Sequence, residues 1–130
     1  MSVTTLTISI NRGPKSVYEF VSDLANLPKW ATAFCLSIKQ EGGEGWLAQT
    51  PQGPVKIRIT PRNEFGILDH VVMASPSVEV HVPMRVVQNG KGSEVLFTLF
   101  RRPDMTDIQY TEDQALVRQD LATLKRVLER

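Results

Sequence analysis

Residues 14–30, PKSVYEFVSDLANLPKW, decide the fold of this chain. Pro14 suits the first turn of a helix. Apolar residues follow it at three- and four-residue spacing, as on one face of a helix: Val17, Phe20, Val21 and Leu24. Because Pro28 cannot stand inside a helix, we expect a second short helix over residues 27–34. The stretch therefore predicts two short helices that meet at an angle.

Strand patterns surround this stretch. Leu6, Ile8 and Ile10 alternate with polar residues, which predicts a half-buried strand before the helices. Between residues 35 and 101, turn signals recur about every ten residues and divide the segment into six antiparallel strands. These signals are Gly42-Gly43, Gln52-Gly53, Asn63-Glu64, Ser75-Pro76-Ser77 and Asn89-Gly90-Lys91-Gly92.

The chain closes with an apolar stripe at helical spacing, formed by Val117, Leu121, Leu124 and Leu128. Thr111 and Gln114 have the spacing of a capping box, which predicts a helix start near Thr111. A helix with one apolar face must lie on an apolar surface, and the sheet offers one. The order strand, two helices, six strands and helix predicts a single α+β domain over residues 1–130.

Composition argues against several classes of protein. The 130 residues carry a net charge of +1, with both signs interspersed, so we expect no nucleic-acid partner. No apolar run reaches the roughly 18 residues of a membrane span. Cys35 is the single cysteine and no Cys or His cluster is present, so we expect no metal. The first residues lack a basic region followed by an apolar one, so we expect no secretory signal and a cytoplasmic location.

The register of the strands decides which side chains face the last helix. The turns predict these opposite pairs: Met84 with Phe97, Val86 with Val95, Ile59 with Trp46, Ile57 with Ala48, Ile59 with Leu68, Ile57 with His70, and, across a three-residue loop at 75–77, His70 with Val82. All of these residues fall on one face of the sheet. That face is apolar except for His70.

The family resemblance rests on Val17, Phe20, Asp23, Asn26, Leu27, Pro28 and Trp30, together with the order of elements. In these features the chain resembles the START-like (SRPBCC) superfamily, most of all its polyketide cyclase/dehydrase-type proteins, over nearly its whole length. The resemblance implies a helix-grip fold. In that fold a seven-stranded antiparallel sheet has two short helices after strand 1, and a long C-terminal helix packs across the sheet over a cavity. It also implies a lipid- or polyketide-like ligand. We expect no cofactor.

His70 is the candidate functional residue, since it is the titratable side chain on the apolar face. An imidazole there can bind a ligand carbonyl or hydroxyl, or move a proton near neutral pH. The alternative is a core histidine bonded to a backbone carbonyl or to water. Asp69 forms no dyad with it on a regular strand, because neighbouring side chains point to opposite faces.

The leading hypothesis is a protein that binds a hydrophobic or aromatic small molecule between the sheet and the last helix. The expected ligand contacts are Trp30, Phe34, Trp46, Ile57, His70, Val82, Met84, Phe97, Val117 and Leu121. One alternative is a cyclase or dehydratase with His70 as general acid/base, for which Thr50 and Tyr110 are the available second polar groups. Another is a homodimer with a filled core that meets its partner through Leu47, Leu96 and Phe100.

Overall fold

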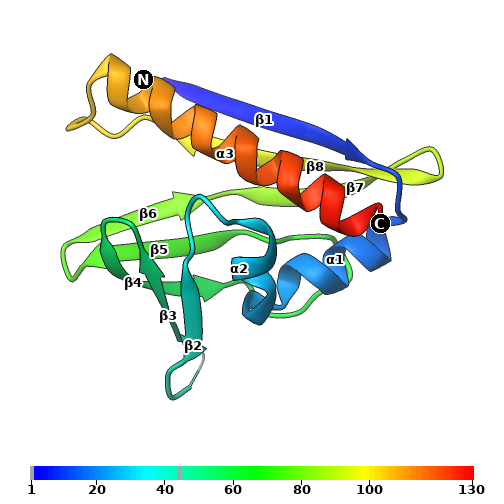
Figure 1. Cartoon of the computed structure of the whole chain (residues 1–130), viewed down its shortest axis with the longest axis horizontal. Helices are drawn as coiled ribbons and strands as arrows, with labels where there is room; N and C mark the ends of the chain where they lie inside the picture. Colours follow the sequence, from blue (N-terminus) through cyan, green and yellow to red (C-terminus); the bar gives the residue numbers. More distant parts are fainter. Residues whose placement is uncertain (1, 44) are drawn as a thin grey trace.

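The computed structural model describes residues 2–43 and 45–130, which form antiparallel sheets with a long C-terminal helix packed on them (Figure 1). In chain order the elements are β1 (Val3–Ile10), α1 (Pro14–Ser22), the 3-10 turn η1 (Leu24–Asn26), α2 (Leu27–Trp30), β2 (Ser37–Gln40), β3 (Trp46–Thr50), β4 (Gly53–Ile59), β5 (His70–Ser75), β6 (Val78–Val82), β7 (Met84–Asn89), β8 (Gly92–Phe100) and α3 (Asp107–Leu128). The predicted α+β class is confirmed. No helix of the described residues is long and apolar enough to cross a membrane.

The prediction of one seven-stranded sheet is wrong. The strands form a three-stranded sheet in the order β1-β8-β7 and a five-stranded sheet in the order β2-β3-β4-β5-β6. The division falls at Pro83, between β6 and β7, inside what the turn pattern predicts to be one strand. Proline has no N–H to donate to a ladder, so pairing is interrupted there.

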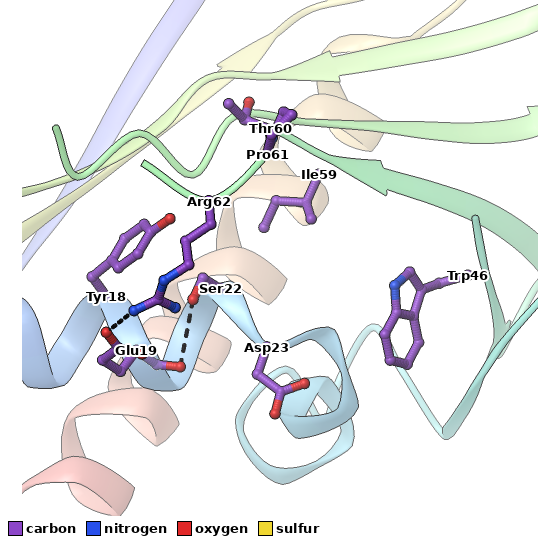
Figure 2. Close-up of a pocket in the computed structure, with 9 residues that line it drawn as sticks. All are labelled: Tyr18, Glu19, Ser22, Asp23, Trp46, Ile59, Thr60, Pro61 and Arg62. Carbon is purple, nitrogen blue, oxygen red and sulfur yellow. Dashed lines mark hydrogen bonds and ion pairs between the residues drawn. The ribbon is translucent and has the colours of Figure 1, made fainter. Parts of the chain in front are cut away.

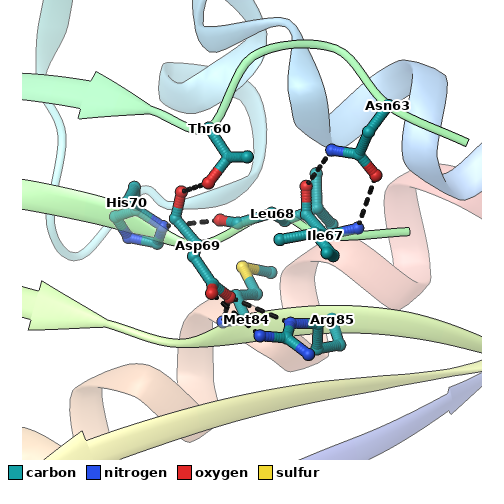
Figure 3. Close-up of polar contacts among 8 residues, drawn as sticks. All are labelled: Thr60, Asn63, Ile67, Leu68, Asp69, His70, Met84 and Arg85. Carbon is teal, nitrogen blue, oxygen red and sulfur yellow. Dashed lines mark hydrogen bonds and ion pairs between the residues drawn. The ribbon is translucent and has the colours of Figure 1, made fainter. Parts of the chain in front are cut away.

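The Asp69 carboxylate and a backbone hydrogen bond bridge this interruption (Figure 3). Asp69 Oδ1 accepts the Met84 backbone N–H at 2.9 Å, and the Leu68 N–H donates to the Met84 carbonyl at 2.9 Å. The Arg85 guanidinium donates to both Asp69 oxygens, at 3.1 and 2.9 Å. Because Asp69 is held toward Arg85 on the outer face, His70 is directed to the inner face.

The predicted register is confirmed between β7 and β8, where Met84 lies opposite Phe97 and Val86 opposite Val95. The predicted register is wrong by two residues in the β3–β4 and β4–β5 hairpins. Trp46 faces Ile57 rather than Ile59, and Ile59 faces His70 rather than Leu68. A shift of two keeps every side chain on its predicted face, because the strand repeat is two residues.

The hairpin of β5 and β6 pairs His70 with Val82, as predicted, but its loop length and strand regularity differ from the prediction. The loop has two residues between Ser75 and Val78 rather than three, which alone would turn His70 to the other face. A register shift between Met73 and Ser75, characteristic of a β-bulge, compensates for the missing loop residue.

The predicted second helix over residues 27–34 is also wrong, because α2 ends at Trp30. The buried Asp120 carboxylate of α3 accepts the Ala33 N–H at 2.9 Å, so the chain after Trp30 is tied to α3 as a turn. This long-range contact has no counterpart in the local sequence pattern.

The last helix begins at Asp107, earlier than the predicted Thr111. Its capping box is formed by Thr106 and Gln109. The Thr106 N–H donates to Gln109 Oε1 at 2.9 Å, and the Gln109 N–H donates to Thr106 Oγ1 at 3.1 Å. Both Thr106 and Thr111 precede a Gln by three residues, so spacing alone cannot distinguish them. The predicted stripe is confirmed in part, since Leu121 and Leu124 are fully packed in the core.

Replacing Asp69 with Ala should lower the free energy of unfolding by about 1–3 kcal/mol, because the Met84 N–H loses its partner where the sheet is interrupted. Arg85→Ala is the matched control. It removes the exposed partner of the same carboxylate and should cost no more than about 0.5–1 kcal/mol. Urea denaturation measures both values. Equal losses would show that the ion pair, rather than the backbone bond, stabilises the junction.

Candidate functional site

A hollow of about 480 Å³ lies between the end of α1 and the end of β4 (Figure 2). Its lining residues are Tyr18, Glu19, Ser22, Asp23, Trp46, Ile59, Thr60, Pro61 and Arg62. We call this space the α1–β4 hollow. Its volume falls within the roughly 300–1,000 Å³ of sites that bind small molecules.

Charged residues lie at one side of the hollow. Arg62 forms an ion pair with Glu19, and its guanidinium lies 5.7 Å from the centre of the Tyr18 ring. The hydrogen bond from Arg62 lowers the pKa of Glu19, which is therefore ionised at neutral pH. The charges of Glu19 and Arg62 compensate each other. Asp23, whose Oδ1 accepts the Ala25 N–H at 3.1 Å, adds one formal negative charge to the lining residues.

The loop after β4 is held in place by Asn63. Its Oδ1 accepts the N–H groups of Phe65 and Ile67 at 3.0 and 3.1 Å, and its Nδ2 donates to the carbonyls of Pro61 and Ile67. Figure 3 shows the two bonds to Ile67. Its backbone N–H donates to the Tyr18 hydroxyl at 2.8 Å. The two walls of the hollow, α1 and the end of β4, are thus connected by hydrogen bonds.

The opposite side of the hollow is apolar. Trp46 and Ile59 are half-buried there and share the inner face of the five-stranded sheet. Ile59 lies directly opposite His70, and Val72 and Phe97 pack half-buried against the core behind them. We call Trp46, Ile59, His70, Val72 and Phe97 the inner strip. Trp46 and Ile59 line the hollow itself, and the pairing of Ile59 with His70 connects the hollow to the rest of the strip.

His70 is held in one protonation state by its surroundings. Its Nδ1 lies 3.0 Å from the Leu68 carbonyl oxygen, which can only accept, so Nδ1 carries the hydrogen (Figure 3). Burial lowers the pKa of the imidazole below its ordinary value, which makes the ring neutral at pH 7. Nε2 is then an acceptor. The edge of the ring meets the Phe97 ring at 6.1 Å between centroids.

The hydroxyls of Thr50, Thr60 and Tyr110 are engaged within the protein. The Thr50 hydroxyl donates to the backbone carbonyl of Gly53 at 2.7 Å, and the Thr60 hydroxyl donates to the backbone carbonyl of Asp69 at 2.8 Å. The Tyr110 hydroxyl lies 3.0 Å from the Leu99 carbonyl and 2.9 Å from the Thr4 hydroxyl. Among the described residues, no group of three His, Cys, Asp or Glu is placed to hold a metal ion.

The predicted ligand contacts fall into two groups. Phe34, Trp46, His70, Phe97 and Val117 are half-buried, and Trp46 is the member of the whole predicted set that borders the α1–β4 hollow. The others are closed into the core at 1–9% exposure, and these are Trp30, Ile57, Val82, Met84 and Leu121. The hollow therefore lies beside α1 rather than under the middle of α3.

Several lining residues are missing from the sequence prediction, among them Tyr18, Glu19, Ile59 and Arg62. The predicted register placed Ile59 on the inner face, and this placement could have identified Ile59 as a lining residue. Glu19 and Arg62 are 43 residues apart, and no local pattern indicates that they pair.

Comparison with known proteins gives likeness in structure alone. No family model matches the chain, and no curated protein matches it. XoxI from Bacillus cereus is 20% identical with a TM-score of 0.80, over 98% of this chain and 96% of that protein. The Aha1 dimer from Colwellia psychrerythraea is 18% identical with a TM-score of 0.77, over 99% and 97%.

A third similar structure is DynU16, a protein from the dynemicin biosynthetic locus. It is 14% identical with a TM-score of 0.76, and the match covers 99% of this chain but 48% of DynU16. Identities this low show a shared fold and leave function to the site itself. The chain has the α+β architecture of these proteins, with a long C-terminal helix on antiparallel sheets.

The desolvated imidazole of His70 predicts an acid-sensitive fold. Because its pKa is lowered in the folded protein, the unfolded chain takes up the proton first. The contribution of His70 to stability should be complete above its unfolded pKa of about 6.5, and should fall as the pH drops below that value. His70→Phe should remove this part of the pH dependence in urea denaturation.

The control for that measurement is His81→Phe, since the side chain of His81 is exposed on the outer face at 68%. We expect the acid sensitivity of the wild type to persist in this variant. NMR titration of the two histidines gives the direct comparison. If His70 titrated like an exposed histidine, it would not be buried on the inner face.

Proposed function

We propose that this protein binds an apolar small molecule, aromatic or lipid-like, in the α1–β4 hollow and along the inner strip. One observation carries the proposal: Trp46 and Ile59 leave accessible apolar surface inside a concave site of about 480 Å³. In this hollow the apolar side chains of Trp46, Ile59 and Pro61 lie beside polar side chains that can orient a ligand, and small-molecule sites combine the two. Trp46 and Phe97 supply aromatic contact area, and His70 supplies the orienting hydrogen bond.

We also propose that the chain is a START-like protein of the polyketide cyclase/dehydrase type. The helical motif of residues 14–30 supports this assignment, as does the fold shared with a protein of the dynemicin biosynthetic locus. In this proposal Phe34 and Val117 extend the contact surface toward α3, and the buried members of the predicted set support it from behind.

Binding without catalysis fits the site better than a cyclase does. General acid/base chemistry needs a second polar group within reach of the same substrate. The hydroxyls of Thr50, Thr60 and Tyr110 are engaged in hydrogen bonds within the protein. Asp69 is turned to the outer face by its bonds to Arg85 and Met84. His70 therefore acts as a single polar contact in an otherwise apolar strip.

The test is a dye that fluoresces in apolar surroundings, such as ANS. It should bind the wild type at about one site, and Ile59→Trp should abolish binding, because the larger side chain fills the hollow. Arg58→Trp is the matched control. Arg58 precedes Ile59 on β4 and is exposed on the outer face, so the same bulky residue there should leave dye binding unchanged.

A second control addresses the outer face, where Val3 and Phe100 lie opposite each other and are 56% and 50% exposed. Phe100→Gln should not affect dye binding. If Phe100→Gln removed the dye and Ile59→Trp did not, the dye would be bound to the outer face and the proposed site would be wrong.

A further inference from the structure

The position of the single N–H hydrogen on the His70 ring restricts which ligand groups can bind this side chain. The neutral imidazole has one N–H, and that hydrogen is committed to the Leu68 carbonyl. The opposite tautomer would direct a lone pair of Nδ1 at the carbonyl oxygen across 3.0 Å, which is repulsive. Nε2 therefore presents a lone pair, and it makes no hydrogen bond to any of the residues the structure describes.

The groups around the ring are apolar. Ile59 and Val82 lie opposite His70 on the neighbouring strands, and Phe97 meets its edge. The nearest charges, Asp69 and Arg85, are paired with each other on the outer face. A cationic donor would lose its hydration here without gaining a countercharge, which is costly. A neutral donor has no such penalty.

We infer that the site selects an apolar molecule that ends in a neutral hydroxyl, whose O–H donates to His70 Nε2. A ketone or an ether on the same apolar body offers only acceptor lone pairs, so it leaves Nε2 unmatched in an apolar space. Phenols and long-chain or polycyclic alcohols are the ligand classes that meet this requirement. The inference rests on the proposed function, because it assigns the polar end of the same ligand.

The experiment compares two probes of nearly the same shape, 1-naphthol and 1-methoxynaphthalene, by displacement of ANS at pH 7.5. Wild-type protein should bind 1-naphthol about five- to thirtyfold more tightly than 1-methoxynaphthalene. This ratio is what one added hydrogen bond, and one acceptor no longer left without a partner, should contribute to binding. In His70→Phe this ratio should fall to about one, with little change for 1-methoxynaphthalene. In His81→Phe the ratio should stay at the wild-type value.

The outcomes separate the two proposals. If neither probe binds, the proposed function fails and the inference falls with it. If both probes bind the wild type equally, the inference is overturned while the proposed function stands. A preference for 1-naphthol that survived in His70→Phe would also overturn it, because another group would then be the acceptor.

Nitrogen NMR of wild-type protein tests the same inference without a substitution. The two-bond couplings between ring hydrogens and ring nitrogens distinguish the tautomers of histidine. We expect His70 with Nδ1 protonated, and a change in the Nε2 shift when 1-naphthol is added. Protonation at Nε2 in the free protein would overturn the inference even if His70→Phe failed to fold.

Discussion

The hydrogen bond from the Met84 N–H to the Asp69 carboxylate is the contact on which the site depends. Pro83 interrupts the ladder, and the Asp69 side chain takes the place of a backbone acceptor beside that interruption. Arg85 and the Met84 N–H together lower the pKa of Asp69, so the carboxylate is ionised when the bond forms. With Asp69 held outward, the strand repeat of two residues places His70 inward.

The hollow persists because its two walls are connected at their ends. The Tyr18 hydroxyl accepts the Asn63 N–H, and Glu19 pairs with Arg62 on the surface beside it. Between these contacts, Trp46 and Ile59 lie half-buried at the edge of the core. A domain of this size buries roughly two-thirds of its unfolded surface. The closed part of its core is formed by residues such as Val17, Ile57 and Leu124, and the inner strip is left at its edge.

The sequence predicted the faces of the strands better than their pairing. Alternation placed Trp46, Ile57, Ile59 and His70 on one side, and this placement survived two-residue shifts because such shifts preserve the face. The hairpin at Ser75 kept its pairing because a bulge offset a shorter loop.

Features set by long-range contacts could not be predicted in this way. The end of α2 depends on Asp120, 87 residues from the Ala33 N–H that it accepts. The ion pair of Glu19 and Arg62 likewise joins residues from separate elements. Pro83 lies inside what the turn pattern predicted as one strand, and the carboxylate that bridges the interruption follows only from the folded register.

The two tryptophans allow the most direct test of the proposed site. Trp46 borders the hollow, whereas Trp30 is 4% exposed within the core. Each gives one indole N–H signal in a proton–nitrogen correlation spectrum, and the two are assigned by single Trp→Phe substitutions. On titration with 1-naphthol, we predict that the Trp46 signal shifts with saturation while the Trp30 signal stays in place. Two unmoved signals, or a shift confined to Trp30, would contradict a ligand site in the α1–β4 hollow.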